Sequence, residues 1–221
     1  MERERELRNR FREFSYIVSK NNTKTCWVLK CDIRKFFASI DHGILMDILR
    51  RHIKDSSTIS LSQEIIGSFS SGKPCVGLPL GNLTSQLLVN IYLNEFDQFM
   101  KHKLRAKHYI RYTDDFVILS EDRRWLETLI PPLKDFLENR LRLTLHPDKV
   151  LLKTLASGVD FLGWVNFADH RVLRTATKRR MMRQIEEEPT PAIINSYIGL
   201  LKHGNTSGLR EKIIGTTMDL E

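Results

Sequence analysis

The sequence predicts an α+β fold in which an antiparallel sheet carries helices on one face. The main observation is the order of its periodic segments, because strand, helix, long helix, hairpin, helix and strand follow one another over residues 26–145, as in a split β-α-β unit. Residues 108–119 supply a second observation. Two short runs rich in β-branched and aromatic residues flank Thr113-Asp114-Asp115 there, which predicts a β-hairpin with the aspartates at its tip.

The first half of the sheet and its helices follow from local patterns. Apolar residues at three- and four-residue steps predict a helix over residues 3–19. A β-like run over 26–33 contains Asp32 near its end. Asp41 is suited to cap a helix over 43–53, which favours a capping role over metal binding. The Ser/Thr-rich stretch at 56–62 is expected to precede another short helix.

Residues 72–81 contain several Gly and Pro residues and predict an irregular loop. A long amphipathic helix is expected over 83–104. Another helix is predicted over 122–141, where Pro131-Pro132 can kink or split it. Residues 141–145 then have a β-like composition.

The C-terminal part changes in composition. A second hairpin is expected over residues 150–165 with Ser157-Gly158 at its turn. Basic residues become dense from 174 onward, before helix-like segments around 190–203 and 206–214. We therefore expect a small basic helical domain at 174–221.

Composition narrows the class of protein. The 221-residue chain has a net charge of +8 and a pI of about 9.5, so polyanions such as nucleic acids are candidate partners. No apolar run approaches the ~20 residues that span a bilayer, and the charged N-terminus lacks an apolar signal core, so a cytoplasmic protein without a membrane partner is expected. Cys26, Cys31 and Cys75 show no zinc-site spacing and are expected to be reduced structural thiols.

Three aspartates are the strongest candidates for chemistry. In the predicted topology, Asp32 at the end of the first strand can lie beside Asp114 and Asp115 in the hairpin turn. Clustered carboxylates in a basic protein suggest a two-metal phosphoryl-transfer site. The alternative is structural, because aspartate is common in turns for its own hydrogen-bonding reasons.

Five ordered stretches resemble the motifs of bacterial reverse transcriptases. They are the first catalytic motif at 32–42, the Tyr-x-Asp-Asp motif at 112–115, the later lysine motif at 145–149, the primer-grip hairpin at 161–164 and a thumb motif at 196–205. The resemblance implies a palm with an RRM-like antiparallel sheet, a small helical thumb and an RNA-directed DNA polymerase activity. It also implies template RNA, a DNA or RNA primer and dNTPs as partners, with two Mg²⁺ ions as cofactors that Mn²⁺ can replace.

Residues 77–86 indicate which group of reverse transcriptases the chain resembles most. Most reverse transcriptases are expected to have Gln-Gly here and Ser-Pro a few residues later, whereas this chain has Leu80-Gly81 and Ser85-Gln86. This departure resembles the reverse transcriptases of diversity-generating retroelements. That family implies error-prone copying of a template-repeat RNA into cDNA that replaces a variable region (mutagenic retrohoming), with a small basic accessory protein as partner.

The resemblance implies the following site residues. Asp32, Ile33, Asp114 and Asp115 form the metal site, and Lys149 joins the three aspartates in catalysis. The dNTP site comprises Phe36, Phe37, Leu80, Gly81, Asn82 and Gln86. Phe161, Leu162, Gly163 and Trp164 form the primer grip. Phosphate contacts are assigned to Lys178, Arg179, Arg183, Lys202 and His203.

Several of these residues also have a structural interpretation. Phe37 is expected to exclude a 2′-hydroxyl, but Phe36 and Phe37 also suit a core. Asn82 suits the N-cap of the following helix. Lys149 is placed to stabilise leaving pyrophosphate, or is a solvent-facing turn lysine. The basic residues after 174 suit either duplex phosphates or a solvated helix face.

The predicted domains are a remnant of the fingers at 1–31, the palm at 32–173 and the thumb at 174–221. Only 31 residues precede Asp32, so we expect partial fingers and an uncertain activity for this chain alone. Two alternatives stay open: a group II intron or retron reverse transcriptase, and a catalytically silent RNA-binding remnant. The absence of room for a maturase or endonuclease segment after 221 is expected to disfavour the intron type.

Overall fold

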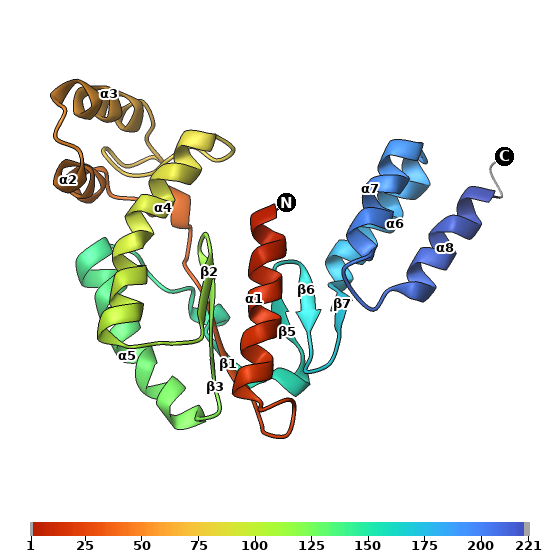
Figure 1. Ribbon diagram of the computed structural model, residues 1–221. Coiled ribbons are helices and arrows are strands. Elements are labelled where there is room, and N and C mark those ends of the chain that lie inside the picture. The colour runs from red at the N-terminus through yellow and green to blue at the C-terminus, as the bar shows by residue number, and fades with distance from the viewer. Residues whose placement is uncertain (1, 219–221) are drawn as a thin grey trace. The chain divides into compact units, whose positions relative to one another are not determined.

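A computed structural model describes residues 2–218 and divides the chain into two compact units. One unit comprises residues 27–152, and the other combines 1–26 with 153–221. Figure 1 traces both units along the chain. The first helix of the sequence therefore belongs with the C-terminal helices and not with the sheet that directly follows it.

The unit at 27–152 is built on a four-stranded sheet in the order β2-β3-β1-β4. β1 pairs antiparallel with β3, and β3 pairs antiparallel with β2. The strands are β1 (Trp27–Asp32), β2 (Tyr109–Tyr112), β3 (Asp115–Ser120) and β4 (Leu151–Thr154). The boundary between the two units, after residue 152, falls within β4.

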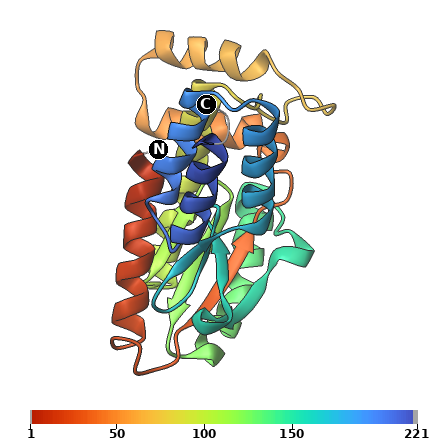
Figure 2. The same ribbon diagram turned by 90° about the vertical axis from the view of Figure 1, so that its right-hand side faces the viewer.

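α4 (Leu83–Gln98) and α5 (Arg123–Leu141) cover one face of this sheet. α2 (His42–His52) packs against α4, and α3 (Ser56–Gly67) packs against α2. Figures 1 and 2 show α4 and α5 on the same side of the strands. Leu29 and Cys31 of β1 and Phe116 and Ile118 of β3 are buried with these helices in one hydrophobic core. A π-helical turn, η2 (Phe99–Lys103), extends α4 toward the hairpin.

The other unit combines α1 (Glu2–Val18) with a small antiparallel sheet in the order β5-β6-β7 and three helices. Its strands are β5 (Val159–Phe161), β6 (Trp164–Asn166) and β7 (Arg171–Leu173), and its helices are α6 (Thr175–Glu187), α7 (Pro191–Leu201) and α8 (Ser207–Met218). Trp164, Met181 and Leu201 are fully buried in its second core, so the strands and the helices share one hydrophobic centre.

Most predicted elements are confirmed. The antiparallel sheet with helices on one face is present, and the 108–119 hairpin turns at Thr113 and Asp114. Asp41 caps α2, because its Oδ1 accepts a 3.0 Å hydrogen bond from the Ile44 N–H. Within the part of the chain that the structure describes, no helix combines the length and the apolar character needed to cross a membrane.

Two predictions were wrong because pairing between strands is not a local property. The 150–165 segment is not one hairpin: β4 joins the four-stranded sheet, whereas β5 pairs with β6. The hairpin turn is Leu162-Gly163, since both residues have the positive φ that a tight turn requires. The β-like run at 141–145 forms no strand and contributes only the bridge between Leu145 and Ile33.

Two helices also differ from expectation. The Ser/Thr-rich stretch at 56–62 lies inside α3, whose first turn is capped by Asp55. α5 contains Pro131 and Pro132 without being divided into two helices. The leucines along its buried face explain its persistence, because packing of an apolar face supplies most of a helix's stability in a protein.

Candidate active site

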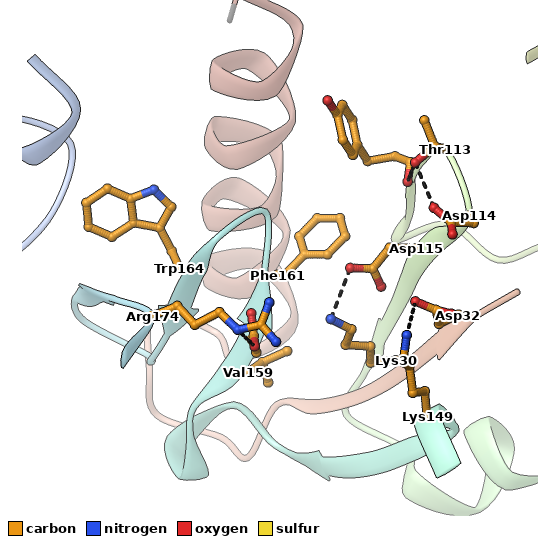
Figure 3. Close-up of polar contacts among 12 residues, drawn as sticks. Lys30, Asp32, Thr113, Asp114, Asp115, Lys149, Val159, Phe161, Trp164 and Arg174 are labelled. Atoms are coloured by element: carbon orange, nitrogen blue, oxygen red, sulfur yellow. Dashed lines mark hydrogen bonds and ion pairs between the residues drawn. The ribbon is translucent and has the colours of Figure 1, made fainter. Parts of the chain in front are cut away.

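The register of β1 and β3 brings the predicted aspartates together. Asp32 lies directly opposite Asp115, and Asp114 occupies the turn that connects β2 to β3. Figure 3 shows the three carboxylates at this end of the sheet. The Ile33 N–H donates a 3.1 Å hydrogen bond to the Asp114 carbonyl oxygen, so the turn is fastened to the end of β1.

The aspartates occupy the face of the sheet opposite the helices. Side chains alternate along a strand, and the odd-numbered residues of β1, such as Leu29 and Cys31, are in the core beneath the helices. Asp32 therefore points to the other face, as does its cross-strand partner Asp115. The side chains of these two aspartates remain 17% and 22% exposed, so neither is completely enclosed.

Two lysines balance this acidic pair. Like charges directly opposite one another destabilise a sheet. Lys30 Nζ lies 3.0 Å from Asp115 Oδ2, and Lys149 Nζ lies 3.0 Å from Asp32 Oδ2 (Figure 3). Lys30 is two residues before Asp32 on the same face of β1, whereas Lys149 comes from the short helix η3 (Pro147–Lys149).

Burial dominates the electrostatics of Asp115. Desolvation raises the pKa of its carboxyl to about 6, against the opposing effect of Lys30, and the charges of Asp32 and Asp114 add to the rise. Asp115 Oδ1 is also buried without a hydrogen-bond partner. An oxygen in this position is costly unless a donor or a cation binds it.

The turn that carries Asp114 is held by Arg111. This side chain, 6% exposed, contacts both carboxylate oxygens of Asp97 in α4 at 2.9 and 2.6 Å. It also donates a 3.1 Å hydrogen bond to the carbonyl oxygen of Thr113, a residue in the left-handed region at φ 51°. The Tyr109 hydroxyl donates to the same Asp97 carboxylate at 2.8 Å. A buried ion pair thus ties the turn to α4.

The donor set suits a hard divalent cation, because three carboxylates share one end of the sheet and one buried oxygen lacks a partner. Among residues 2–218, however, no three His, Cys, Asp or Glu side chains are gathered closely enough to hold an ion as they stand. Asp32 and Asp115 are each paired with a lysine in this arrangement. Metal binding therefore requires at least one ammonium group to move away.

Lys149 is the predicted catalytic residue that the structure joins to the aspartates, through its contact with Asp32. Phe36 and Phe37 lie in η1 (Phe36–Ser39) and contact each other edge to face at 5.5 Å. Phe36 is 2% exposed and belongs to the core, so it has almost no surface to offer a nucleotide. Phe37 is only half-buried and keeps an exposed surface.

The Leu80-Gly81-Asn82 stretch, where the sequence is expected to depart from the usual pattern, lies on the surface. Leu80 is 78% exposed, and Gly81 has a φ of 92° that favours glycine. Asn82 occupies the N-cap position of α4, but its side chain makes no capping hydrogen bond. Gln86 is exposed one turn into the same helix. Leu80, Gly81, Asn82 and Gln86 therefore remain available to a ligand.

The predicted primer-grip and phosphate residues belong to the other compact unit. Phe161 and Trp164 are each 1% exposed, so of these four predicted primer-grip residues only Leu162 and Gly163 keep exposed surface. Lys178, Arg179 and Arg183 are exposed on α6. Lys202 and His203 follow α7.

Sequence reasoning missed two supporting contacts. The two-residue spacing of Lys30 and Asp32 could have indicated Lys30, because this spacing places both side chains on one face of a strand. The pair formed by Arg111 and Asp97 had no comparable signal. Their 14-residue separation matches no pattern within one helix or strand, and the contact depends on how α4 packs beside β2.

Acidic residues at the adjoining ends of antiparallel strands define a class of site suited to metal-assisted phosphoryl transfer. A family model described as "Reverse transcriptase (RNA-dependent DNA polymerase)" matches residues 5–165, more than half of the chain. The chain belongs to this reverse transcriptase family.

Curated relatives agree with this assignment. The chain is 27% identical over 206 residues to Protein YkfC of Escherichia coli, covering 76% of this chain and 52% of that protein. It is 26% identical over 227 residues to the group II intron-encoded protein LtrA of Lactococcus lactis, covering 70% of this chain and 36% of LtrA. The chain therefore spans about half or less of the length of these relatives.

Solved structures share the fold at low sequence identity. A Candida tropicalis telomerase in complex with a TWJ fragment of telomeric RNA covers 98% of this chain and 43% of its own, with a TM-score of 0.64 and 11% identity. Apo telomerase from the same organism covers 74% of this chain and 35% of its own, with a TM-score of 0.60 and 12% identity.

Proposed function

We propose that this chain carries the catalytic residues of an RNA-directed DNA polymerase. The observation that carries the proposal is the pairing of Asp32 with Asp115, beside a turn that presents Asp114. Membership of the reverse transcriptase family supports it. In this proposal residues 32–173 are the palm, 174–221 are the thumb and 1–31 are part of the fingers. The ligands are a template RNA, a primer and dNTPs.

The proposed reaction joins the primer 3′-oxygen to the α-phosphorus of a dNTP, while the bond to the β-phosphate breaks and pyrophosphate leaves. Asp32, Asp114 and Asp115 would hold two Mg²⁺ ions, whose chemistry is to lower the pKa of the attacking hydroxyl and to stabilise the leaving oxygen. Lys149, half-exposed beside Asp32, can turn toward the leaving pyrophosphate and offset its charge. Lys30 keeps Asp115 in place.

Phe37 is the proposed discriminator between dNTP and rNTP. Its ring packs against the buried Phe36 and keeps an exposed face, so a rigid aromatic surface is available for the sugar. A 2′-hydroxyl would collide with such a surface, whereas a deoxyribose would fit. Phe36 supports the ring and makes no proposed contact with the nucleotide.

The finer proposal is a reverse transcriptase of the diversity-generating retroelement type. Its support is the exposed Leu80-Gly81-Asn82 stretch and Gln86, where other reverse transcriptases are expected to have a different pattern. An apolar Leu80 in place of glutamine removes a polar group that could check the nascent base pair. Loose checking would yield cDNA with errors concentrated at template adenines. A small basic accessory protein is the proposed partner.

A group II intron type is the second candidate, and one observation favours it. LtrA, which resembles 70% of this chain, is named as a group II intron-encoded protein. The two candidates share the same chemistry at the aspartates. They differ in the expected fidelity and in the RNA that is copied.

One assay tests the shared chemistry and separates the candidates. The protein is given an RNA template, a DNA primer, dNTPs and Mg²⁺, and the products are sequenced. We expect extension that is lost in Asp114→Asn, with errors concentrated opposite adenine. Uniformly low error rates favour the intron type. RNA binding without extension would refute the polymerase proposal and favour an RNA-binding remnant.

Leu80→Gln tests the explanation for infidelity in the same assay. The substitution restores the polar side chain expected in other reverse transcriptases and is made at an exposed position, so it should not disturb the fold. We expect fewer errors opposite adenine with extension retained. An unchanged error spectrum would show that Leu80 is not the source of infidelity.

A further inference from the structure

The loop that leads to the exposed Leu80-Gly81-Asn82 stretch is bonded to the segment that carries Phe37. The Leu78 N–H donates a 2.8 Å hydrogen bond to the Phe37 carbonyl oxygen. The Gly77 N–H donates another, also of 2.8 Å, to the Ile40 carbonyl oxygen. Two parts of the proposed dNTP site are therefore joined through the backbone, within the unit of residues 27–152.

The other end of this loop is held to the same segment. Ser71 Oγ donates a 2.8 Å hydrogen bond to the Ala38 carbonyl oxygen. The His42 N–H donates one of 3.0 Å to the Cys75 carbonyl oxygen. We call residues 71–78 the anchored loop, because contacts near both of its ends fix it beside η1 and the start of α2.

The side chain of His42 fixes one peptide group of the anchored loop. His42 is 7% exposed, and its Nε2 lies 2.6 Å from the Gly77 carbonyl oxygen. Because a carbonyl oxygen only accepts, Nε2 carries the proton of this hydrogen bond. The same peptide group supplies the Leu78 N–H that donates to Phe37. One planar unit therefore joins the His42 imidazole to the backbone of Phe37.

Gly77 is the residue that permits this arrangement. Its φ of 102° lies in the region that favours glycine, and a Cβ here would come within 2.7 Å of Ser71 Cβ. Leu78 follows, 3% exposed in the hydrophobic core. Leu80 is already 78% exposed, and a Cβ on Gly81 would have no described residue within 4 Å apart from its chain neighbours. The anchored loop therefore sets the point from which the exposed stretch extends.

We propose that His42 is a positioning residue for nucleotide selection. Through one peptide group, it fixes the Phe37 ring relative to the Leu80-Gly81-Asn82 stretch. The role rests on the proposed function, in which Phe37 meets the sugar of the dNTP. Without the imidazole, the buried Gly77 carbonyl oxygen loses its donor, and the peptide group would rotate to find another. The Phe37 carbonyl oxygen would lose its own donor at the same time, and the ring would no longer be held against a 2′-hydroxyl.

Substitutions at two buried positions of α2 test this role in the full chain. His42→Ala removes the donor to Gly77. His42→Gln places an amide N–H close to the position of Nε2 and should keep the hydrogen bond, whereas His42→Asn is one carbon shorter and should not. This pair keeps the comparison available if His42→Ala does not fold. Ile48→Ala is the control, since Ile48 is 2% exposed in the same helix but has no polar group to offer the anchored loop.

Sugar selectivity is measured as the ratio of kcat/KM for a dNTP to kcat/KM for the matching rNTP, in primer extension on RNA with Mg²⁺. We expect His42→Ala and His42→Asn to lower this ratio about tenfold, within the range that misplacement of a positioned group costs. His42→Gln should keep most of the ratio, and Ile48→Ala should leave it unchanged while lowering stability. A ratio unchanged in both His42→Ala and His42→Asn, or an equal fall in Ile48→Ala, would overturn the proposal.

A double variant tests whether His42 acts through Phe37. In Phe37→Ala the exposed ring is absent, and selectivity should already be low. His42→Ala added to it should cause no further fall, because the peptide group then has no ring to fix. Two independent, additive falls would show that His42 affects selection by another route and would overturn the proposal.

Hydrogen exchange of the Leu78 amide provides a readout that needs no catalysis. This amide should exchange faster in His42→Ala and His42→Asn than in Ile48→Ala, and unchanged protection would overturn the proposal. Absence of extension by the unmodified protein would refute the polymerase proposal, and with it the role of His42 in selection. Extension with unaltered selectivity and protection in the His42 variants would refute the role of His42 alone.

Discussion

At the scale of single residues, the site depends on how buried charges are paired. Asp32 and Asp115 face each other across two strands, and Lys30 and Lys149 balance them. The pair formed by Arg111 and Asp97 lies nearby and holds the Thr113 carbonyl oxygen. We assign Arg111 a positioning role, because it holds the backbone of the turn through Thr113 and makes no contact with the side chains of the three candidate metal-binding aspartates.

Arg111→Lys keeps the positive charge but loses the bidentate contact with the Asp97 carboxylate. We expect a loss of about 1–3 kcal/mol in the free energy of unfolding, measured in urea, since charged hydrogen bonds are lost from a buried pair. Primer extension should fall further than this stability loss explains, with kcat more affected than KM. The matched control is Arg123→Lys, whose pair with Glu127 is exposed on α5 and should cost less than about 0.5 kcal/mol. Equal effects of the two substitutions would contradict the positioning role.

The three thiols should differ sharply in reactivity. Burial raises the pKa of Cys26 and of Cys31 to about 12, whereas Cys75 is exposed. A raised pKa leaves almost no thiolate at pH 8, and thiolate is the form that reacts. Iodoacetamide at pH 8 should therefore modify Cys75 first, as mass spectrometry of the native protein would detect. Rapid modification of Cys31 would show that the core opens near the aspartates.

At the scale of helices and strands, capping fixes where α2 begins. Burial would raise the pKa of the Asp41 carboxyl, but the Ile44 N–H and Arg142 together lower it below its ordinary value. Arg142 Nη1 lies 2.5 Å from Asp41 Oδ2, so this residue also links α2 to the end of α5. A lowered pKa means that ionised Asp41 stabilises the fold.

Asp41→Ala should reduce the free energy of unfolding by about 1–2 kcal/mol at pH 7. The contribution is present above the unfolded-state pKa of the carboxyl and is lost as pH falls through the lowered folded-state pKa. The difference from the unmodified protein, measured by urea unfolding, should thus shrink in acid. Asp55→Ala removes the exposed cap of α3 and is the control, with a smaller expected effect. A difference that persists unchanged in strong acid would contradict this account.

Local elements could be predicted from the sequence because their signals are local. The Asp41 cap and the hairpin around Asp114 are each indicated by residues that are neighbours in the sequence. The partners of β4 and β5 could not be predicted, since the pairing of a strand depends on residues far along the chain. The α3 boundary was missed because Ser and Thr favour both caps and turns, so the 56–62 stretch was ambiguous.

In the candidate site, too, local features could be predicted from the sequence and contacts between distant elements could not. The proximity of Asp32 to Asp115 followed from the predicted topology, and the structure gives their exact opposition through the strand register. Lys30 was detectable in principle from strand alternation. The contact between Arg111 and Asp97 could not be detected from the sequence, because it depends on the packing of a helix against a strand.

At the scale of the whole molecule, each compact unit has a hydrophobic core of its own. Leu201 is fully buried in the core that contains Trp164, and Leu133 is fully buried in the core beneath the four-stranded sheet. Elements with separate cores can open separately.

Leu201→Ala should therefore destabilise the unit of 1–26 and 153–221 by about 2–5 kcal/mol. Hydrogen exchange should accelerate in β5–β7 and α6–α8, with little change in β1–β3. Leu133→Ala is the reciprocal variant and should accelerate exchange in the sheet of residues 27–152. Uniform acceleration across both units in either variant would indicate a single cooperative unit instead.

The lysine partners of Asp32 and Asp115 have a consequence for how metal would load. Lys30 and Lys149 are counter-ions attached to the chain itself, so Asp32 and Asp115 would hold a divalent cation only if an ammonium group moved away from its carboxylate. The affinity for metal would then be the difference between the carboxylate–metal and the carboxylate–lysine interactions. A displaced Lys149, which is half-exposed on a short helix, would then be free to contact the triphosphate of the proposed substrate. Loading of the metal and release of a cation toward the substrate would thus be one coupled event.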